Sequence, residues 1–187
     1  MKTAALFLAA LLAGCATPEA GNAPPDRFFA SLASLCGKAF EGRIASPPVE
    51  ADAAFSGKRL LIHVHGCTDA EIRIPSHVGE DRSRTWVVTR TREGLRLKHD
   101  HRHADGSEDK LTQYGGNSIG EGTALRQEFP ADAFSKALFT RESIPASTAN
   151  VWAMEVGGGV FAYELRRPGR FFRVEFDLTR PIAPPSS

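Results

Sequence analysis

The sequence predicts a mostly β protein, an antiparallel meander that closes into a barrel or a strongly curled sheet. Short segments rich in Val, Ile, Phe, Thr and Arg recur at near-regular spacing between Gly and Pro residues. Along the last two segments every second residue is apolar, from Phe161 to Leu165 and from Phe172 to Leu178, as in half-buried antiparallel strands. Only two short stretches have helical spacing. A closed barrel would also remove the exposed edges of so many strands.

The expected elements begin with a short helix from Arg27 to Cys36, capped by Asp26, with an apolar stripe formed by Phe28, Phe29, Leu32 and Leu35. Nine strands follow, at 38–46, 58–66, 70–78, 84–92, 95–103, 122–129, 150–156, 160–167 and 170–178. A second short helix is expected over 132–140, because Ala133, Phe134, Ala137 and Leu138 recur at helical spacing after an Asp.

These elements form one domain over 26–180, followed by a disordered Pro/Ser tail at 181–187. A short leading helix, a long antiparallel meander and one late helix resemble the calycin group, which includes lipocalins and fatty-acid-binding proteins. The likeness is one of architecture over 38–178, and the first strand lacks the Gly-x-Trp signature of lipocalins. It implies a β-barrel body, although a fold does not by itself carry a function.

The amino terminus has the pattern of an export signal at 1–14. Met1 and Lys2 precede an apolar run from Ala4 to Ala13, which is too short to span a bilayer. The run ends in Leu12-Ala13-Gly14-Cys15, which resembles the lipobox of bacterial lipoproteins. That resemblance implies diacylglycerol on the Cys15 sulfur, cleavage before Cys15 and acylation, for example by palmitate, of the new amino terminus. The alternative is an ordinary signal peptide with an incidental cysteine.

The mature chain would begin with a lipidated cysteine and a flexible tether at 15–25, rich in Pro, Gly and Ala. Ala16, rather than Asp, follows the cysteine, and in the lipoprotein resemblance this implies release to the periplasmic face of the outer membrane. Removal of 1–14 takes away Lys2 as the one charged side chain, which leaves 22 basic and 22 acidic residues. Because nucleic-acid binding needs a basic surplus, we expect none, and the bilayer would be reached through the acyl chains.

Two further cysteines, Cys36 and Cys67, predict a disulfide in an oxidising compartment. If the strands at 38–46 and 58–66 pair, the two residues lie roughly opposite each other, within disulfide reach. Two separate buried thiols are the alternative.

All six histidines fall between positions 63 and 103, and His99, His101 and His103 share one face of a strand. Two of them could bind zinc or another transition metal together with a third ligand such as Asp105, Asp109 or a histidine from 63–65. The stretch is similar to a cupin motif, imperfectly, because Gly94 is one residue too close and Asp105 replaces glutamate. Leu95 and Leu97 have the same parity, which places this row on an inward face; Arg96, Lys98, Asp100 and Arg102 would face solvent. The alternative is a polar strand end in which the histidines pair with Arg and Asp.

Three other features could carry chemistry. Gly116-Asn117-Ser118-Ile119-Gly120 matches the Gly-x-Ser-x-Gly pattern of serine hydrolases, but no strand–turn–helix context surrounds it, and it is interpreted as a glycine-rich loop. Arg82 and Arg84 could bind an anionic group, or pair with Glu80 and Asp81 in a solvated turn. Trp86 and Trp152 are expected in the core, where they could also line an aromatic cavity, and Trp86 joins Arg82 and Arg84 as a candidate for a ligand or anion site.

These observations together predict an exported, lipid-anchored periplasmic protein. Its expected role is non-enzymatic, either binding a small apolar or amphipathic ligand inside the barrel or contacting another envelope protein. No cofactor is expected on this reading. The alternative is a metal-dependent, cupin-like enzyme that uses zinc or a similar ion on the strand from His99 to His103.

Overall fold

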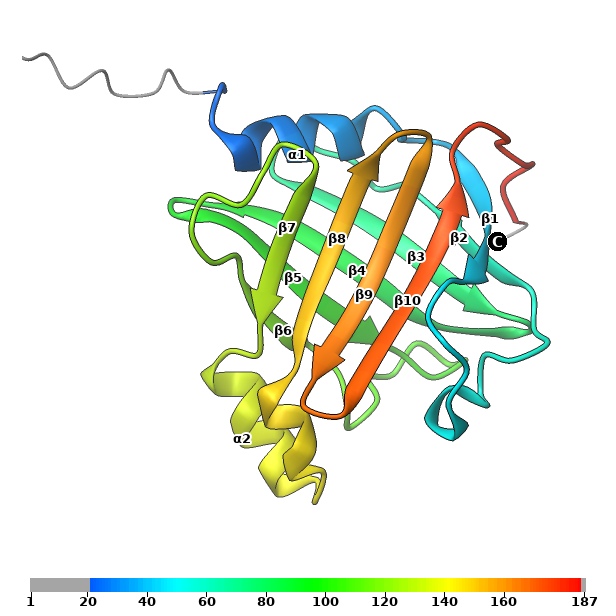
Figure 1. The fold of residues 1–187 in the computed structure, drawn as a ribbon, viewed down its shortest axis with the longest axis vertical. Helices are drawn as coiled ribbons and strands as arrows, with labels where there is room; N and C mark the ends of the chain where they lie inside the picture. Colours follow the sequence, from blue (N-terminus) through cyan, green and yellow to red (C-terminus); the bar gives the residue numbers. More distant parts are fainter. Residues whose placement is uncertain (1–20, 186–187) are drawn as a thin grey trace, which may run out of the picture.

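A computed structural model describes residues 21–185 and contains one ten-stranded antiparallel sheet, so the predicted mostly β class is confirmed (Figure 1). The sheet order is β6-β5-β4-β3-β2-β1-β10-β9-β8-β7. The strands are β1 (Ala39–Ile44), β2 (Leu60–His63), β3 (Glu71–Val78), β4 (Asp81–Thr91), β5 (Gly94–His101), β6 (Tyr114–Asn117), β7 (Arg126–Pro130), β8 (Val151–Gly157), β9 (Val160–Arg167) and β10 (Arg170–Asp177).

The sheet curls until its two edge strands, β6 and β7, approach each other. The backbone N–H of Asp132 donates to the Gly115 carbonyl at 2.9 Å, and that of Ile119 donates to the Glu128 carbonyl at 3.2 Å. A few hydrogen bonds of this kind replace a full ladder at the seam. The result is a nearly closed barrel, in which one wall consists of β7 to β10 and the other of β3 to β5 (Figure 1).

The helix α1 (Pro24–Ala33) covers one end of the barrel (Figure 1). It buries Phe28, Phe29 and Leu32 completely or nearly so, as the predicted apolar stripe requires. The predicted cap is wrong: the helix begins at Pro24, after Ala23, because proline suits the first helical turn. Asp26 lies inside that turn and forms an ion pair with Arg90 of β4, which fastens the helix to the barrel.

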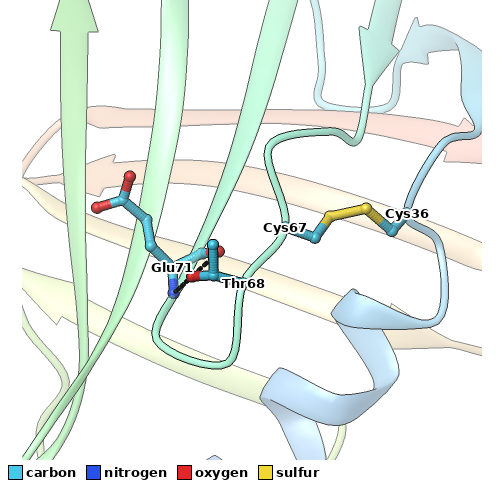
Figure 2. Close-up of a disulfide and its surroundings, with 4 residues drawn as sticks. All are labelled: Cys36, Cys67, Thr68 and Glu71. Atoms are coloured by element: carbon cyan, nitrogen blue, oxygen red, sulfur yellow. Dashed lines mark hydrogen bonds between the residues drawn. A yellow bond between two sulfur atoms is a disulfide. The ribbon is translucent and has the colours of Figure 1, made fainter.

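A disulfide joins Cys36 to Cys67, as predicted, with the two Cα atoms 6.3 Å apart. Cys36 lies in the turn after α1 and Cys67 in the connection from β2 to β3 (Figure 2). That connection is itself tightened by Thr68, whose hydroxyl accepts a hydrogen bond from the backbone N–H of Glu71 at 2.9 Å. A bridge across 31 residues stabilises the fold by about 3–4 kcal/mol on the chain-entropy argument.

The opposite end of the barrel carries α2 (Ala133–Arg141) and two 3-10 turns, η1 (Glu50–Asp52) and η2 (Pro145–Ala149). As the sequence predicts, the Asp132 side chain caps α2, accepting a hydrogen bond from the Ser135 N–H at 2.8 Å. The α2 helix and η2 pack together beside the ends of β7 and β8 (Figure 1).

The inner faces of the strands form a single apolar core, and Leu95 and Leu97 face inward as predicted. Asp100 of β5 was expected to face solvent, but the structure shows it buried. Arg73 and Arg102 form ion pairs with its carboxylate, and the Gln113 amide donates to it, so these side chains shield it from water.

Further differences concern the segments around the strands. The strand β6 is not among the nine expected, and β7 is shorter than the expected 122–129. The predicted tail at 181–187 is partly attached, since the Ile182 N–H donates to the Ala39 carbonyl at 2.9 Å.

The export signal, Cys15 and most of the predicted tether lie outside the described residues. Within residues 21–185 no helix has the length and apolar character needed to cross a membrane.

Candidate ligand cavity

A cavity of about 610 Å³ occupies the end of the barrel opposite α1. Inward-facing side chains of β3, β4, β5, β8, β9 and β10 line it, and residues of α2 and η2 complete the wall. This volume lies within the range of small-molecule binding sites, about 300–1,000 Å³. The α1 end of the barrel differs, because there the core side chains are fully packed.

Aromatic rings form the apolar part of the cavity wall. Trp86 stacks on Tyr163 with ring centroids 4.2 Å apart, and Phe55 packs against Phe172 at 4.8 Å. Trp152, on β8, lines the cavity as well. Both tryptophans are therefore core residues and cavity-lining residues at once, the two placements that the sequence allowed.

His99 is a neutral, fully hydrogen-bonded imidazole in this wall. Its Nδ1 lies 3.1 Å from the Tyr114 carbonyl oxygen and its Nε2 lies 2.7 Å from the Tyr163 hydroxyl. A carbonyl can only accept, so Nδ1 carries the proton and Nε2 accepts from the tyrosine. Burial lowers the pKa of His99 to about 3, and it raises the pKa of Tyr163 well above its ordinary value.

His101 has a second tyrosine partner. Its Nε2 lies 3.2 Å from the hydroxyl of Tyr114, and burial, followed by the nearby Arg84, lowers the pKa of His101. Burial also raises the pKa of Tyr114 to about 12. The two histidines and two tyrosines therefore form a hydrogen-bonded band across the cavity wall that is neutral at pH 7.

The predicted metal ligands do not converge. The Nε2 atoms of His99 and His101 both bond to tyrosine hydroxyls, whereas His103 lies in the turn beyond β5, 3.8 Å from Asp109. Asp105 is exposed in the same turn, where its carboxylate accepts hydrogen bonds from Ser107. Within the described part of the chain, no three His, Cys, Asp or Glu side chains come together as a metal site. Of the alternative, a polar strand end whose histidines pair with Arg and Asp, His103 beside Asp109 fits, whereas His99 and His101 pair with tyrosines.

Of the predicted anion-binding residues, the structure brings Arg84 and Trp86 together in the cavity. Arg84 already has an intramolecular partner, because its guanidinium forms an ion pair with Asp81 at 2.5 Å. Partial burial opposes ionisation of Asp81, but hydrogen bonds from Ser83 and Arg84 outweigh it and lower the pKa of that carboxyl to about 2. Arg82 does not line this cavity; it lies at the exposed start of β4.

Ser118 has a structural role. It follows β6 in a loop rather than opening a helix, and its hydroxyl accepts a hydrogen bond from the Leu95 N–H at 3.1 Å. The interpretation of 116–120 as a glycine-rich segment agrees with this, except that Gly116 and Asn117 end a strand.

Several cavity residues were not among the predicted site residues. They include Tyr114 and Tyr163, and the two charged ones are Arg167 and Arg170, at the ends of β9 and β10. The alternation of inward and outward residues along the two strands could have identified these arginines as inward-facing. Arg167 continues the inward row of Phe161, Tyr163 and Leu165, and Arg170 precedes the row that begins with Phe172. Their position beside a Pro-Gly turn made them resemble solvated turn residues instead.

No protein-family model matches this sequence, and comparisons with curated proteins and with solved structures gave no significant match. The functional argument therefore depends on the residues of the cavity.

Proposed function

We propose that this protein is an envelope lipoprotein, anchored through Cys15, whose barrel binds a small apolar or amphipathic ligand. The observation that supports ligand binding is the 610 Å³ cavity, with its aromatic wall and a limited number of polar side chains. An apolar cavity with a few fixed polar groups is the usual form of a small-molecule site. The neutral band of His99, His101 and two tyrosines supplies such groups, already hydrogen-bonded and oriented.

Lipid attachment is supported by the sequence from Met1 to Cys15, and the outer membrane by Ala16. The described chain begins beside α1, at the end of the barrel away from the cavity. An anchor at Cys15 would therefore join the barrel at the end opposite the ligand site. Attachment to the membrane and ligand binding would then use different ends of the molecule.

Ligand binding can be tested with the chain's own fluorescence, because its two tryptophans both line the cavity. Titration with 1-octanol, an uncharged amphiphile, should shift and quench the tryptophan emission in a saturable manner. Binding to the folded state should also raise the melting temperature. The variant Leu165→Trp, which fills cavity space, should weaken the saturable signal. A linear, non-saturating response in the native protein would contradict the proposed function.

Lipidation can be tested separately. We expect Cys15→Ser to abolish labelling by a palmitate analogue and to release the mature protein from the membrane fraction. A single substitution suffices because several acyl chains at one residue provide the anchor. The exposed Ser34→Ala is a control that should remain membrane-bound. Unchanged membrane partition of Cys15→Ser would contradict the lipoprotein proposal without affecting the cavity.

A further inference from the structure

The turn between β9 and β10 places two arginines directly opposite each other. Arg167 and Arg170 are cross-strand partners on either side of Pro168-Gly169, and both side chains line the cavity. Like charges at directly opposed positions destabilise a sheet. A pair of this kind in a partly buried cavity therefore requires a compensating negative charge.

Arg170 is compensated in part. Its Nη2 forms an ion pair with Asp52 of η1, and both side chains are largely buried. The pair is held by one hydrogen bond, which leaves Nη1 of Arg170 and Oδ2 of Asp52 buried without a partner among the described residues. Asp52 itself does not line the cavity, whereas Arg170 does. Asp52 therefore neutralises Arg170, whose Nη1 is enclosed by protein, and the charge of Arg167 is the one that remains to be considered.

Arg167 has neutral partners only. Its Nη1 donates to the Ser147 hydroxyl and to the Asn150 side-chain oxygen, each at 3.1 Å. Across residues 21–185, no carboxylate lies within ion-pair distance of this guanidinium. Ser147 and Asn150, at η2, therefore hold the side chain in place and leave its charge uncompensated.

The remaining charges of the wall do not balance this pair. The one carboxylate that lines the cavity, Asp109, lies 3.8 Å from His103 and accepts a hydrogen bond from the Leu111 N–H. Arg84, the third arginine of the lining, is already paired with Asp81. Among the described residues, Arg167 is thus the one cavity arginine without a carboxylate partner.

Apolar surface adjoins the two arginines. The Arg170 guanidinium lies 5.9 Å from the centre of the Phe172 ring, which packs against Phe55. From there the wall continues to Trp86 and Tyr163. A planar guanidinium binds carboxylate and phosphate oxygens with two hydrogen bonds, and it does so more strongly where water is excluded.

We propose that Arg167 and Arg170 form the head-group site for an amphiphile with an oxyanion, a carboxylate or a phosphate monoester, at one end of an apolar chain. The oxyanion accepts from the free N–H groups of Arg167 and lies beside the charged side chain of Arg170, and the apolar chain lies against the aromatic wall. This inference rests on the proposed ligand-binding function and specifies the chemical class of its ligand.

The test compares octanoate, octyl phosphate and 1-octanol by tryptophan fluorescence on the purified protein. We expect at least one anion to bind about tenfold or more tightly than the alcohol. The two anions distinguish a carboxylate head group from a phosphate. Arg167→Gln should remove most of this preference, and saturable binding of 1-octanol by the variant would show that it is folded. Arg92→Gln, an exposed residue between β4 and β5 at the α1 end, makes the same charge change and should bind like the native protein.

Two outcomes separate this inference from the proposed function. If 1-octanol binds saturably and neither anion binds more tightly, or if Arg167→Gln behaves like Arg92→Gln, the head-group site is overturned and the apolar cavity remains. If none of the three compounds binds saturably, the proposed ligand-binding function is contradicted, and the head-group site with it.

Discussion

His99 is the most strongly perturbed histidine of the described chain. It is buried to 2 % exposure, and both ring nitrogens have hydrogen-bond partners only in the neutral tautomer. Protonation would place a second donor on Nε2, facing the hydroxyl of Tyr163, whose own pKa is raised far above neutrality by burial. The folded state therefore resists the proton that the unfolded chain accepts near pH 6.5.

This difference makes stability depend on pH. As pH falls below about 6.5 the unfolded state binds a proton at His99 and the folded state does not until about pH 3, so stability is lost over that window. We expect the free energy of unfolding to fall by about 2 kcal/mol between about pH 7.5 and pH 5 from this residue alone. Burial lowers the pKa of His101 as well, so its contribution has the same sign.

Urea unfolding at both pH values measures the effect. The variant His99→Gln should have a weaker pH dependence, whereas His103→Gln, an exposed control, should keep the native one. Imidazole NMR provides an independent check on the native protein, in which His99 should stay in the Nδ1–H form throughout. Protonation of His99 near pH 6 would contradict this interpretation.

At the scale of elements, residue patterns predicted some segments well and missed others for identifiable reasons. Alternation in β9 and β10 and the Asp132 cap of α2 are local signals, and the structure contains these strands and this cap. The strand β6 consists of Tyr-Gly-Gly-Asn, and glycine disfavours strands, so its sequence resembles a loop. Its glycines meet a tertiary requirement at the barrel seam, which no local pattern reveals.

The barrel seam requires glycine in β6 for a steric reason. A Cβ on Gly116 would lie 1.8 Å from the carbonyl oxygen of Pro130, the last residue of β7 at the seam. We therefore expect Gly116→Ala to destabilise the protein by about 1–3 kcal/mol, because the two edges must separate to accept the methyl group. Asn117→Ala, on the exposed side of the same strand, should change stability by less than about 0.5 kcal/mol.

Chemical denaturation of the two variants measures these free energies. Hydrogen exchange should in addition show faster opening of the Asp132 N–H, which bonds to the Gly115 carbonyl across the seam. Equal stability of Gly116→Ala and Asn117→Ala would mean that β6 and β7 do not approach as closely as described.

In the candidate site, too, the sequence predicted some residues and missed others. Strand parity correctly placed His99 and His101 toward the barrel interior, whereas His103 lies exposed beyond β5. Parity cannot say which inward residues meet around a cavity. The sequence analysis did not foresee that two tyrosines from β6 and β9, distant in sequence, would bond to the Nε2 atoms of His99 and His101. Arg167 and Arg170 became recognisable as a pair only through the β9–β10 register and the neutral partners on η2.

At the scale of the whole molecule, the barrel has two unlike ends. At one end α1, its ion pair to β4 and the Cys36–Cys67 disulfide close a buried apolar core. At the other end α2 and the 3-10 turns surround a cavity with aromatic walls and positively charged side chains. The cavity end suits a ligand with one apolar and one anionic end. The helix, ion pair and disulfide that stabilise the fold lie at the other end, away from the cavity.

The most direct test of cavity binding is a crystal structure of the protein with 8-bromooctanoate, in which the anomalous signal of bromine locates the apolar end. We expect the bromine inside the barrel, against Trp86 or Phe176, with the carboxylate within hydrogen-bond distance of Arg167 and beside Arg170. Bromine sites confined to the outer surface, with the cavity free of ligand density, would contradict the proposal that this barrel is a ligand-binding protein.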